Sequence, residues 1–246
     1  MERKNFLRSL IVGAATAPML LDACQKDSTT PSSTSTSTST STSTSTSSSS
    51  SSSSNSCTVA PTETEGPFPT KTPASYVRSD ITDGRTGYKL TIKITIDSSS
   101  SCTALSGALV DIWHCDAEGN YSEYGGSSMQ TTNYTSVHFL RGRQTTDSNG
   151  LVTFTSIFPG WYSGRATHIH VHVYNASGTS LKVTQIAFPE GTGTALALVN
   201  GYAKGLTGYT YNSSDNVFSD DTSGLEIAAV TGNLTDGFVL TKVINV

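Results

Sequence analysis

Short runs of alternating hydrophobic and polar residues recur over the last three quarters of the chain. Residues 89–97 (KLTIKITID) alternate strictly, which is typical of a β-strand with one buried face. Further strands are expected at residues 108–114, 151–157, 168–174, 181–187, 225–230 and 238–246. Turn signals such as Asn-Gly, Pro-Gly and Gly-Thr-Gly separate them, and only residues 193–201 could form a short helix. This pattern predicts an all-β fold, either a sandwich or a barrel.

The first 56 residues lack this alternation, and they begin with a sequence typical of an export signal. A basic start is followed by an apolar stretch at residues 10–21, which predicts a signal peptide over residues 1–23. Leu21-Asp22-Ala23-Cys24 resembles the lipobox of bacterial lipoproteins, in which the cysteine is lipidated. We therefore expect an exported, membrane-anchored lipoprotein, periplasmic or on the cell surface. A secreted protein with a plain signal peptide, or an uncleaved anchor, is the alternative, and both the Sec and Tat routes stay open.

Residues 28–56 consist almost entirely of Ser and Thr. Such a segment cannot bury enough apolar surface to offset the entropy lost on ordering, so residues 24–56 are predicted to be a disordered linker. A flexible chain of this length spans roughly 30 Å. The folded domain is expected over residues 57–246.

The charge argues against one class of function, and the cysteine content limits the possible disulfides. The chain has 15 Lys and Arg against 19 Asp and Glu, and it has no basic patch, which argues against nucleic-acid binding. Beyond Cys24, the cysteines are Cys57, Cys102 and Cys115, and none lies in a Cys-x-x-Cys motif. They allow one disulfide and one free thiol. All three pairings are open, and we favour Cys57–Cys102.

The candidate chemistry is concentrated at residues 154–172 (FTSIFPGWYSGRATHIHVH). His168 and His170 point to the same face of a strand and can converge on one metal ion, and His172 is a candidate third ligand. Tyr162 and Arg165 lie just upstream. No Asp or Glu stands in an His-x-Asp/Glu pattern beside His168, whereas tyrosine is close by. Phenolate ligands require a strong Lewis acid, which favours ferric iron over zinc.

A second aromatic cluster, residues 113–124 (WHCDAEGNYSEY), places Tyr121 just past the end of a strand. Loops at strand ends build sites, so Tyr121 is a candidate partner for the histidines, with Tyr124 as its rival. His114 and His138 are expected to make structural hydrogen bonds, and Arg141-Gly142-Arg143 to be structural or to line a substrate mouth.

Three segments, GALVDIWHCDAEGNYS, FLRGRQTTDSNGLVTFTSIFPGWY and RATHIHVHV, resemble the intradiol ring-cleavage dioxygenases of the catechol 1,2- and protocatechuate 3,4-dioxygenase type. The resemblance extends from about residue 57 to the strand that contains Gln185. It implies a β-sandwich of short, mostly antiparallel strands. The helical N-terminal dimerisation region of catechol 1,2-dioxygenases is missing from this sequence.

The resemblance also implies a set of site residues. Four metal ligands and three catalytic roles are assigned: the ligands are Tyr121, Tyr162, His168 and His170, and the catalytic residues are Arg165, Tyr162 and Gln185. The cofactor is ferric iron, Fe(3+), and Tyr162 is the ligand that leaves when substrate binds. Arg165 stabilises negative charge on the substrate ring, and His172 is demoted to a neighbour of the site. Phe68 stands where the family's TxGPY segment has a tyrosine.

The implied reaction is cleavage of a catechol-type diol by O2 to a muconate-type diacid. A non-enzymatic β-sandwich module for adhesion or carbohydrate binding, displayed on the Ser/Thr stalk, is the main alternative. A zinc hydrolase that uses His168, His170 and His172 is the other.

Overall fold

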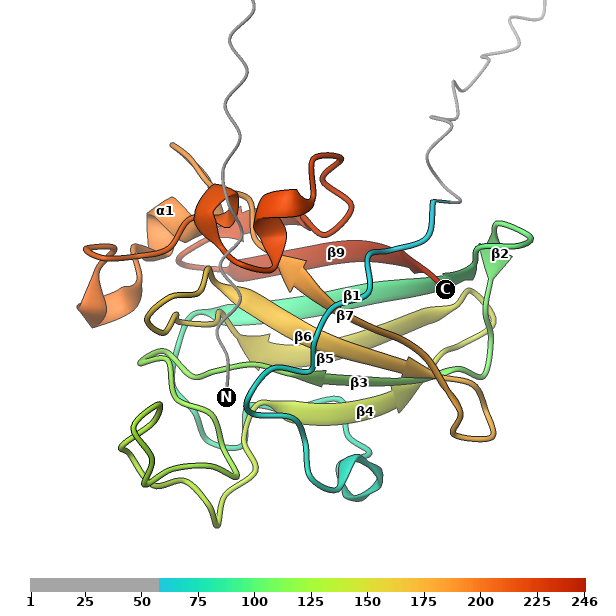
Figure 1. Ribbon diagram of the computed structural model, residues 1–246, viewed down its shortest axis with the longest axis horizontal. Helices are drawn as coiled ribbons and strands as arrows, with labels where there is room; N and C mark the ends of the chain where they lie inside the picture. Colours follow the sequence, from blue (N-terminus) through green and yellow to red (C-terminus); the bar gives the residue numbers. More distant parts are fainter. Residues whose placement is uncertain (1–57) are drawn as a thin grey trace, which may run out of the picture. The chain divides into compact units, whose positions relative to one another are not determined.

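The computed structural model describes residues 58–246, and these form two packed β-sheets (Figure 1). The predictions for the signal peptide, Cys24, the Ser/Thr linker and Cys57 lie outside the described residues. The all-β prediction is confirmed, because strands dominate and the helices are short.

The first sheet is built around β1 (Lys89–Ser98). It has five strands, and the others are β2 (Thr103–Ala104), β5 (Leu151–Ile157), β8 (Ala229–Asn233) and β9 (Gly237–Asn245). β1 pairs antiparallel with β2 and β5 and parallel with β9, while β8 pairs antiparallel with β9. The first long strand and the last strand of the domain are therefore neighbours.

The second sheet has four strands in the order β4-β3-β6-β7, and every neighbouring pair is antiparallel. They are β3 (Leu109–Trp113), β4 (Arg141–Thr145), β6 (His168–Tyr174) and β7 (Ser180–Ala187). β6 lies in the interior of the sheet and is buried on both faces.

The core lies between the two sheets. The apolar positions of β1 and β6 belong to one cluster of buried side chains, and they are Leu90, Ile92, Ile94, Ile96, Ile169, Val171 and Val173. All of these are fully buried, and burying each contributes about 1.5–3 kcal/mol. Because side chains alternate along a strand, the histidines of β6 must occupy the opposite, outer face.

That outer face is covered by an irregular segment of the chain, with no third sheet over it in residues 58–246. The segment before β1 crosses β7 and β6 (Figure 1) and is held there by a hydrogen bond from the amide of Glu63 to the carbonyl of Val183. Gln185 of β7 donates from Nε2 to the carbonyl of Thr64. The histidines of β6 therefore lie under a lid of irregular backbone.

The helical elements are short. α1 (Ala195–Val199) lies within the one stretch where a helix was expected, and Oγ1 of Thr194 accepts a hydrogen bond from the amide of Ala197 at its N-terminus. Four 3₁₀ turns complete the set: η1 (Pro73–Ser75), η2 (Tyr202–Lys204), η3 (Asn212–Ser214) and η4 (Phe218–Asp220).

Three strand predictions differ from the structure, and one of them is the two-residue β2, which was not expected. The strand expected at residues 225–230 begins only at Ala229, because the Asp221 carboxylate accepts hydrogen bonds from the amides of Leu225 and Glu226 and holds them in a loop. β4 was not predicted as a strand. Its Arg141 is fully buried and donates to the carbonyls of Phe68 and Ser122, so its role is structural.

Of the cysteines, Cys102 is disulfide-bonded and Cys115 is free and buried. This rules out the two pairings that involve Cys115, and the partner of Cys102 lies outside the described residues. Burial raises the pKa of the Cys115 thiol, with Asp116 acting in the same direction, so the thiol is unreactive in the folded protein.

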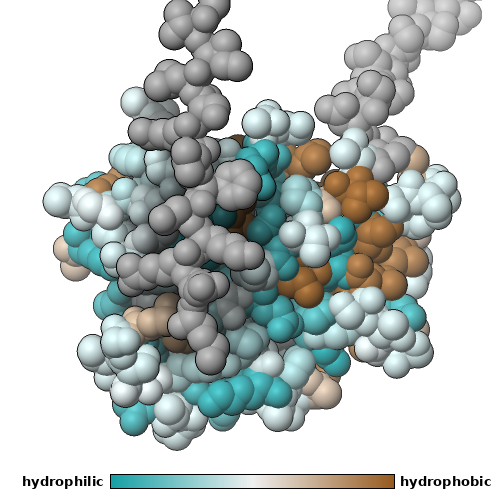
Figure 2. Space-filling model, in the orientation of Figure 1, coloured by the Kyte–Doolittle hydropathy of each residue, from teal (hydrophilic) through white to brown (hydrophobic). Residues whose placement is uncertain are grey.

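The face drawn in Figure 2 is mostly polar, with hydrophobic residues gathered toward one side. Over residues 58–246, no helix is both long and apolar enough to cross a bilayer.

Candidate active site

Three donor atoms from two segments meet over the outer face of β6. Nε2 of His168 lies 3.1 Å from Nε2 of His170 and 3.1 Å from the phenolic oxygen of Tyr121. The period of two along a strand brings the two imidazoles together, and the loop after the neighbouring strand β3 supplies Tyr121. All three side chains are at most 1% exposed, so the donors are shielded from bulk water.

The two imidazoles are held as neutral bases. Nδ1 of His168 lies 2.6 Å from the carbonyl oxygen of Ala166, so Nδ1 carries the proton and Nε2 presents a lone pair. Burial lowers the pKa of His168 to about 3, and it lowers the pKa of His170 well below the ordinary range. The positive charge of Arg165 acts in the same direction on both.

The His170 ring is clamped from two sides. The indole of Trp113 stacks on it with 4.9 Å between centroids and an interplanar angle of 2°. On the covering segment, a Cβ added to Gly66 would lie only 2.9 Å from Cε1 of His170, and Gly66 has a φ of +68°. Only glycine fits this backbone conformation and this close approach without strain.

The two tyrosines differ in access. Tyr121 is fully buried, whereas Tyr162 is half-buried at the edge of the site. The Tyr162 ring lies 5.8 Å from the Tyr121 ring and 5.7 Å from the His168 ring, measured between centroids. Burial raises the pKa of both phenols, and Arg165 partly opposes this at Tyr162. Each is therefore a neutral phenol until a cation competes for its oxygen.

Two glycines allow the loops that carry these tyrosines to pack against each other. A Cβ on Gly119 would lie 2.2 Å from the carbonyl oxygen of Trp161, and one on Gly160 would lie 2.4 Å from that of Ala117. The amide of Gly160 also donates to the carbonyl of Asp116. The turn residues near each tyrosine therefore fix where the two phenols lie.

Arg165 is held rigidly beside the donors. Its Nε donates to Oδ2 of Asp215 at 2.9 Å, and its Nη2 donates to Oε1 of Gln185 at 2.7 Å. Asp215 is fully buried and also accepts from the amides of Ala166 and Val217. The guanidinium is thus a fixed positive charge close enough to act on both His168 and His170.

The role of Asp215 in holding Arg165 was not predicted from the sequence. It lies 50 residues from Arg165 in a loop without hydrophobic periodicity, and nothing in the local pattern marks it. A single Asp in a Ser- and Asn-rich stretch is typical of an ordinary turn.

His172 and Tyr124 have other partners. Nδ1 of His172 lies 2.9 Å from Oε1 of Glu65, and its Nε2 lies 2.8 Å from Oγ of Ser180. The Tyr124 hydroxyl donates to the carbonyl of Pro69. Both ring nitrogens of His172 are therefore engaged away from the point where His168 and His170 meet.

The remaining histidines make structural contacts. The ring nitrogens of His114 lie 2.8 Å from the carbonyl oxygen of Cys115 and 2.7 Å from Oγ of Ser156. Nδ1 of His138 lies 2.7 Å from the hydroxyl of Tyr76 and 3.0 Å from Oε1 of Glu123.

The converging donors fit a hard, strongly Lewis-acidic ion. Two nitrogen ligands about 2.1 Å from one metal at a right angle lie about 3.0 Å apart, close to the 3.1 Å between the two Nε2 atoms. A phenol as buried as Tyr121 loses its proton only to such an ion. His168, His170 and Tyr121 could together hold such an ion, and Tyr162 lies beside them at the accessible edge.

The chain is similar to known proteins in sequence and in fold. A protein-family model described as "Dioxygenase" matches residues 71–229, well over half of the chain. Chlorocatechol 1,2-dioxygenase from Rhodococcus opacus is 29% identical over 108 residues, which cover 36% of this chain and 39% of that protein. The match therefore spans less than half the length of that relative.

Solved structures extend the likeness to the whole domain. An intradiol ring-cleavage dioxygenase from Tetranychus urticae aligns with a TM-score of 0.66 and 28% identity, over 77% of this chain and 94% of that one. The dioxygenase domain of a dioxygenase and carbohydrate-binding fusion from Streptomyces sp. SirexAA-E aligns with a TM-score of 0.54 and 25% identity, over 76% and 97% of the two chains. The chain belongs to the intradiol ring-cleavage dioxygenases, a family of oxidoreductases.

Proposed function

We propose that this protein uses ferric iron to cleave catechol-type diols with O2, between the two hydroxyl-bearing carbons, to muconate-type diacids. The reaction adds both atoms of O2 to the ring carbons and needs no other reductant. The observation that carries the proposal is the meeting of Tyr121, His168 and His170 within 3.1 Å contacts, beside Arg165. When bound there, ferric iron would supply the Lewis acidity that takes up a deprotonated diol and makes its ring reactive toward O2.

The residues of the chain divide the remaining tasks. Tyr121, His168 and His170 are fully buried, so they would hold the metal. Tyr162 is half-buried and lies at the edge, so it can turn away and accept a proton at its phenolate oxygen from an incoming diol hydroxyl. Arg165 remains fixed by Asp215 and Gln185 and stabilises negative charge on the substrate.

Aromatic side chains keep the site dry. Phe68 lies 4.8 Å from Tyr121 and 6.2 Å from Tyr162 between ring centroids. It carries no hydroxyl, so it adds apolar surface at the place where substrate would enter. Water exclusion strengthens the effect of Arg165 on a developing negative charge.

The full-length protein loaded with iron is expected to be coloured by tyrosinate-to-iron charge transfer and to consume one O2 per catechol. The measurement combines metal analysis, the visible spectrum before and after catechol, and an oxygen electrode. Catechol, hydroxyquinol and protocatechuate form the substrate panel. We expect turnover of the first two, because no Lys or Arg is assigned as a clamp for the protocatechuate carboxylate.

Zinc-loaded protein is the matched control and should be colourless and inactive. A protein that purifies with stoichiometric zinc and hydrolyses esters would favour the hydrolase alternative. Iron-loaded, folded protein that takes up no O2 with any member of the panel would favour the binding module.

We also propose that the protein is exported and anchored through Cys24, with residues 24–56 as a tether. Support comes from the basic and apolar start, the Leu-Asp-Ala-Cys segment and the Ser/Thr stretch. In a bacterial host, the full chain should fractionate with membranes, and Cys24→Ser should release it in soluble form or leave its signal uncleaved. Equal membrane association of both proteins without a change in mass would contradict lipidation.

A further inference from the structure

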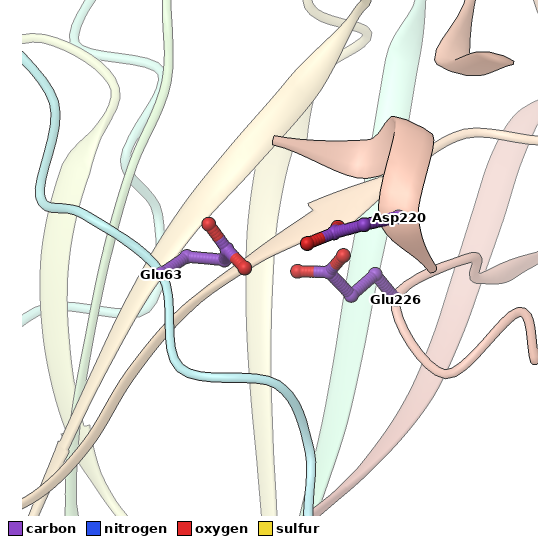
Figure 3. Close-up of side chains that lie close together, drawn as sticks. All are labelled: Glu63, Asp220 and Glu226. Atoms are coloured by element: carbon purple, nitrogen blue, oxygen red, sulfur yellow. The ribbon is translucent and has the colours of Figure 1, made fainter. Parts of the chain in front are cut away.

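Three carboxylates that play no part in the proposed reaction converge at the edge of the second sheet. Glu63 lies on the segment that covers β6, Asp220 ends η4, and Glu226 lies in the loop before β8. One oxygen from each lies within 4.8 Å of the others, and Figure 3 shows the three groups pointing toward a common space.

Glu226 makes this cluster more than a group of surface acids. Its side chain is 1% exposed, and neither carboxylate oxygen has a hydrogen-bond partner in residues 58–246. Burial raises the pKa of Glu226 to about 8, with Glu63, Asp221 and Asp220 adding to the rise. A buried acceptor without a donor is costly, so a bound cation would stabilise the cluster.

No charged neighbour forms an ion pair with Glu226 among residues 58–246. Lys242 lowers the pKa of Glu226 through its charge, but its ammonium donates to the carbonyl of Ile227. Both Asp221 oxygens accept backbone amides, those of Leu225 and Glu226. Arg165, which lowers the pKa of Glu63 from a distance, is engaged by Asp215 and Gln185.

We propose that Glu63, Asp220 and Glu226 bind a hard divalent cation, and that Ca²⁺ is the ion that fits. All three ligands are oxygens, which excludes a preference for the softer transition metals. Ca²⁺ takes six to eight oxygen ligands at about 2.4 Å in a flexible geometry, which suits three carboxylates from separate segments, whereas Mg²⁺ usually binds one or two carboxylates and keeps several waters. The half-exposed side of the cluster leaves room for water ligands.

Such an ion would join three segments that are far apart in the sequence. Glu63 precedes Thr64 and Gly66, which contact Gln185 and His170. Asp220 closes the turn that follows Asp215, the partner of Arg165. The cation would therefore fasten the covering segment to the loop that holds the arginine. Binding itself is independent of the proposed dioxygenase reaction.

The test is calcium binding to the full-length protein after dialysis against EGTA. Calorimetry should give one Ca²⁺ per chain with a Kd of roughly 10⁻⁴–10⁻³ M, and 10 mM Ca²⁺ should raise the Tm by about 3–10 °C. Glu226→Gln and Asp220→Asn should each abolish both effects, and the second variant serves if the first folds poorly. Asp236→Asn, on an exposed turn, should respond like the wild type.

Several results would overturn the proposal. They are no heat of binding and no Tm shift at 10 mM Ca²⁺, or a full shift retained in both cluster variants. A shift of equal size with Mg²⁺ would overturn the choice of Ca²⁺. If the iron-loaded wild-type protein bound Ca²⁺ as expected but showed no dioxygenase activity, the proposed function alone would be wrong.

Discussion

His168→Ala is expected to remove the visible colour and lower catechol-dependent O2 uptake by more than about 100-fold. Changing only a hydrogen-bond partner of a metal ligand costs up to about 100-fold in affinity or activity, and this substitution removes a proposed ligand itself. Nε2 of His168 is the atom that lies within 3.1 Å of both His170 and Tyr121, so its loss breaks the donor set at its centre. Iron content, the visible spectrum and oxygen uptake measure the effect.

His172→Gln is the matched control. It removes an imidazole from the same face of the same strand, but that imidazole contacts Glu65 and Ser180 instead. The variant should keep its iron, colour and turnover. If His172→Gln lost iron as completely as His168→Ala, with both variants folded by circular dichroism, the assignment of ligands would be wrong.

Arg165→Met is expected to keep iron and colour while lowering kcat by about 10²–10³-fold, the usual loss when one preorganised charge is removed from a buried site. The guanidinium is anchored by Asp215 and Gln185 and does not depend on the metal for its position. Arg165→Lys should give an intermediate rate. It keeps the positive charge but loses the planar guanidinium that donates to both Asp215 and Gln185.

Steady-state kinetics with catechol separates this effect from a general change in charge. Lys93→Met, on the exposed face of β1, changes the net charge equally and should leave kcat unchanged. An Arg165→Met enzyme with wild-type kcat and a raised KM would show that the arginine only binds substrate.

The sequence pattern predicts the strands better than their pairing. Alternation identifies β1 and β6, and the same alternation places His168 and His170 on one face, since their spacing is a local property. The parallel pairing of β1 with β9 carries no local signal, because it depends on which distant strand covers the edge of β1. β4 was missed because its Arg-Gly-Arg start is polar, although Arg141 is completely buried.

The candidate ligands, Arg165 and Gln185 were inferred from motifs and the family resemblance, but Asp215, which also holds Arg165, was not. Asp215 and Glu226 are buried acids in loops that look like ordinary turns in the sequence. Their roles arise from neighbours that only the folded chain brings close, Arg165 for Asp215 and two further carboxylates for Glu226. The close approach of Gly66 to the His170 ring also depends on such long-range neighbours.

The pairing of β1 with β9 also limits how early the five-stranded sheet can form. Leu90 through Asp97 align with Phe238 through Asn245, so an inner strand of the five-stranded sheet obtains one of its two long neighbours from a segment far along the chain. During synthesis that sheet stays incomplete until β9 has emerged from the ribosome. Contacts between such distant residues close slowly, so the domain is expected to reach its native state only after β9 has been made.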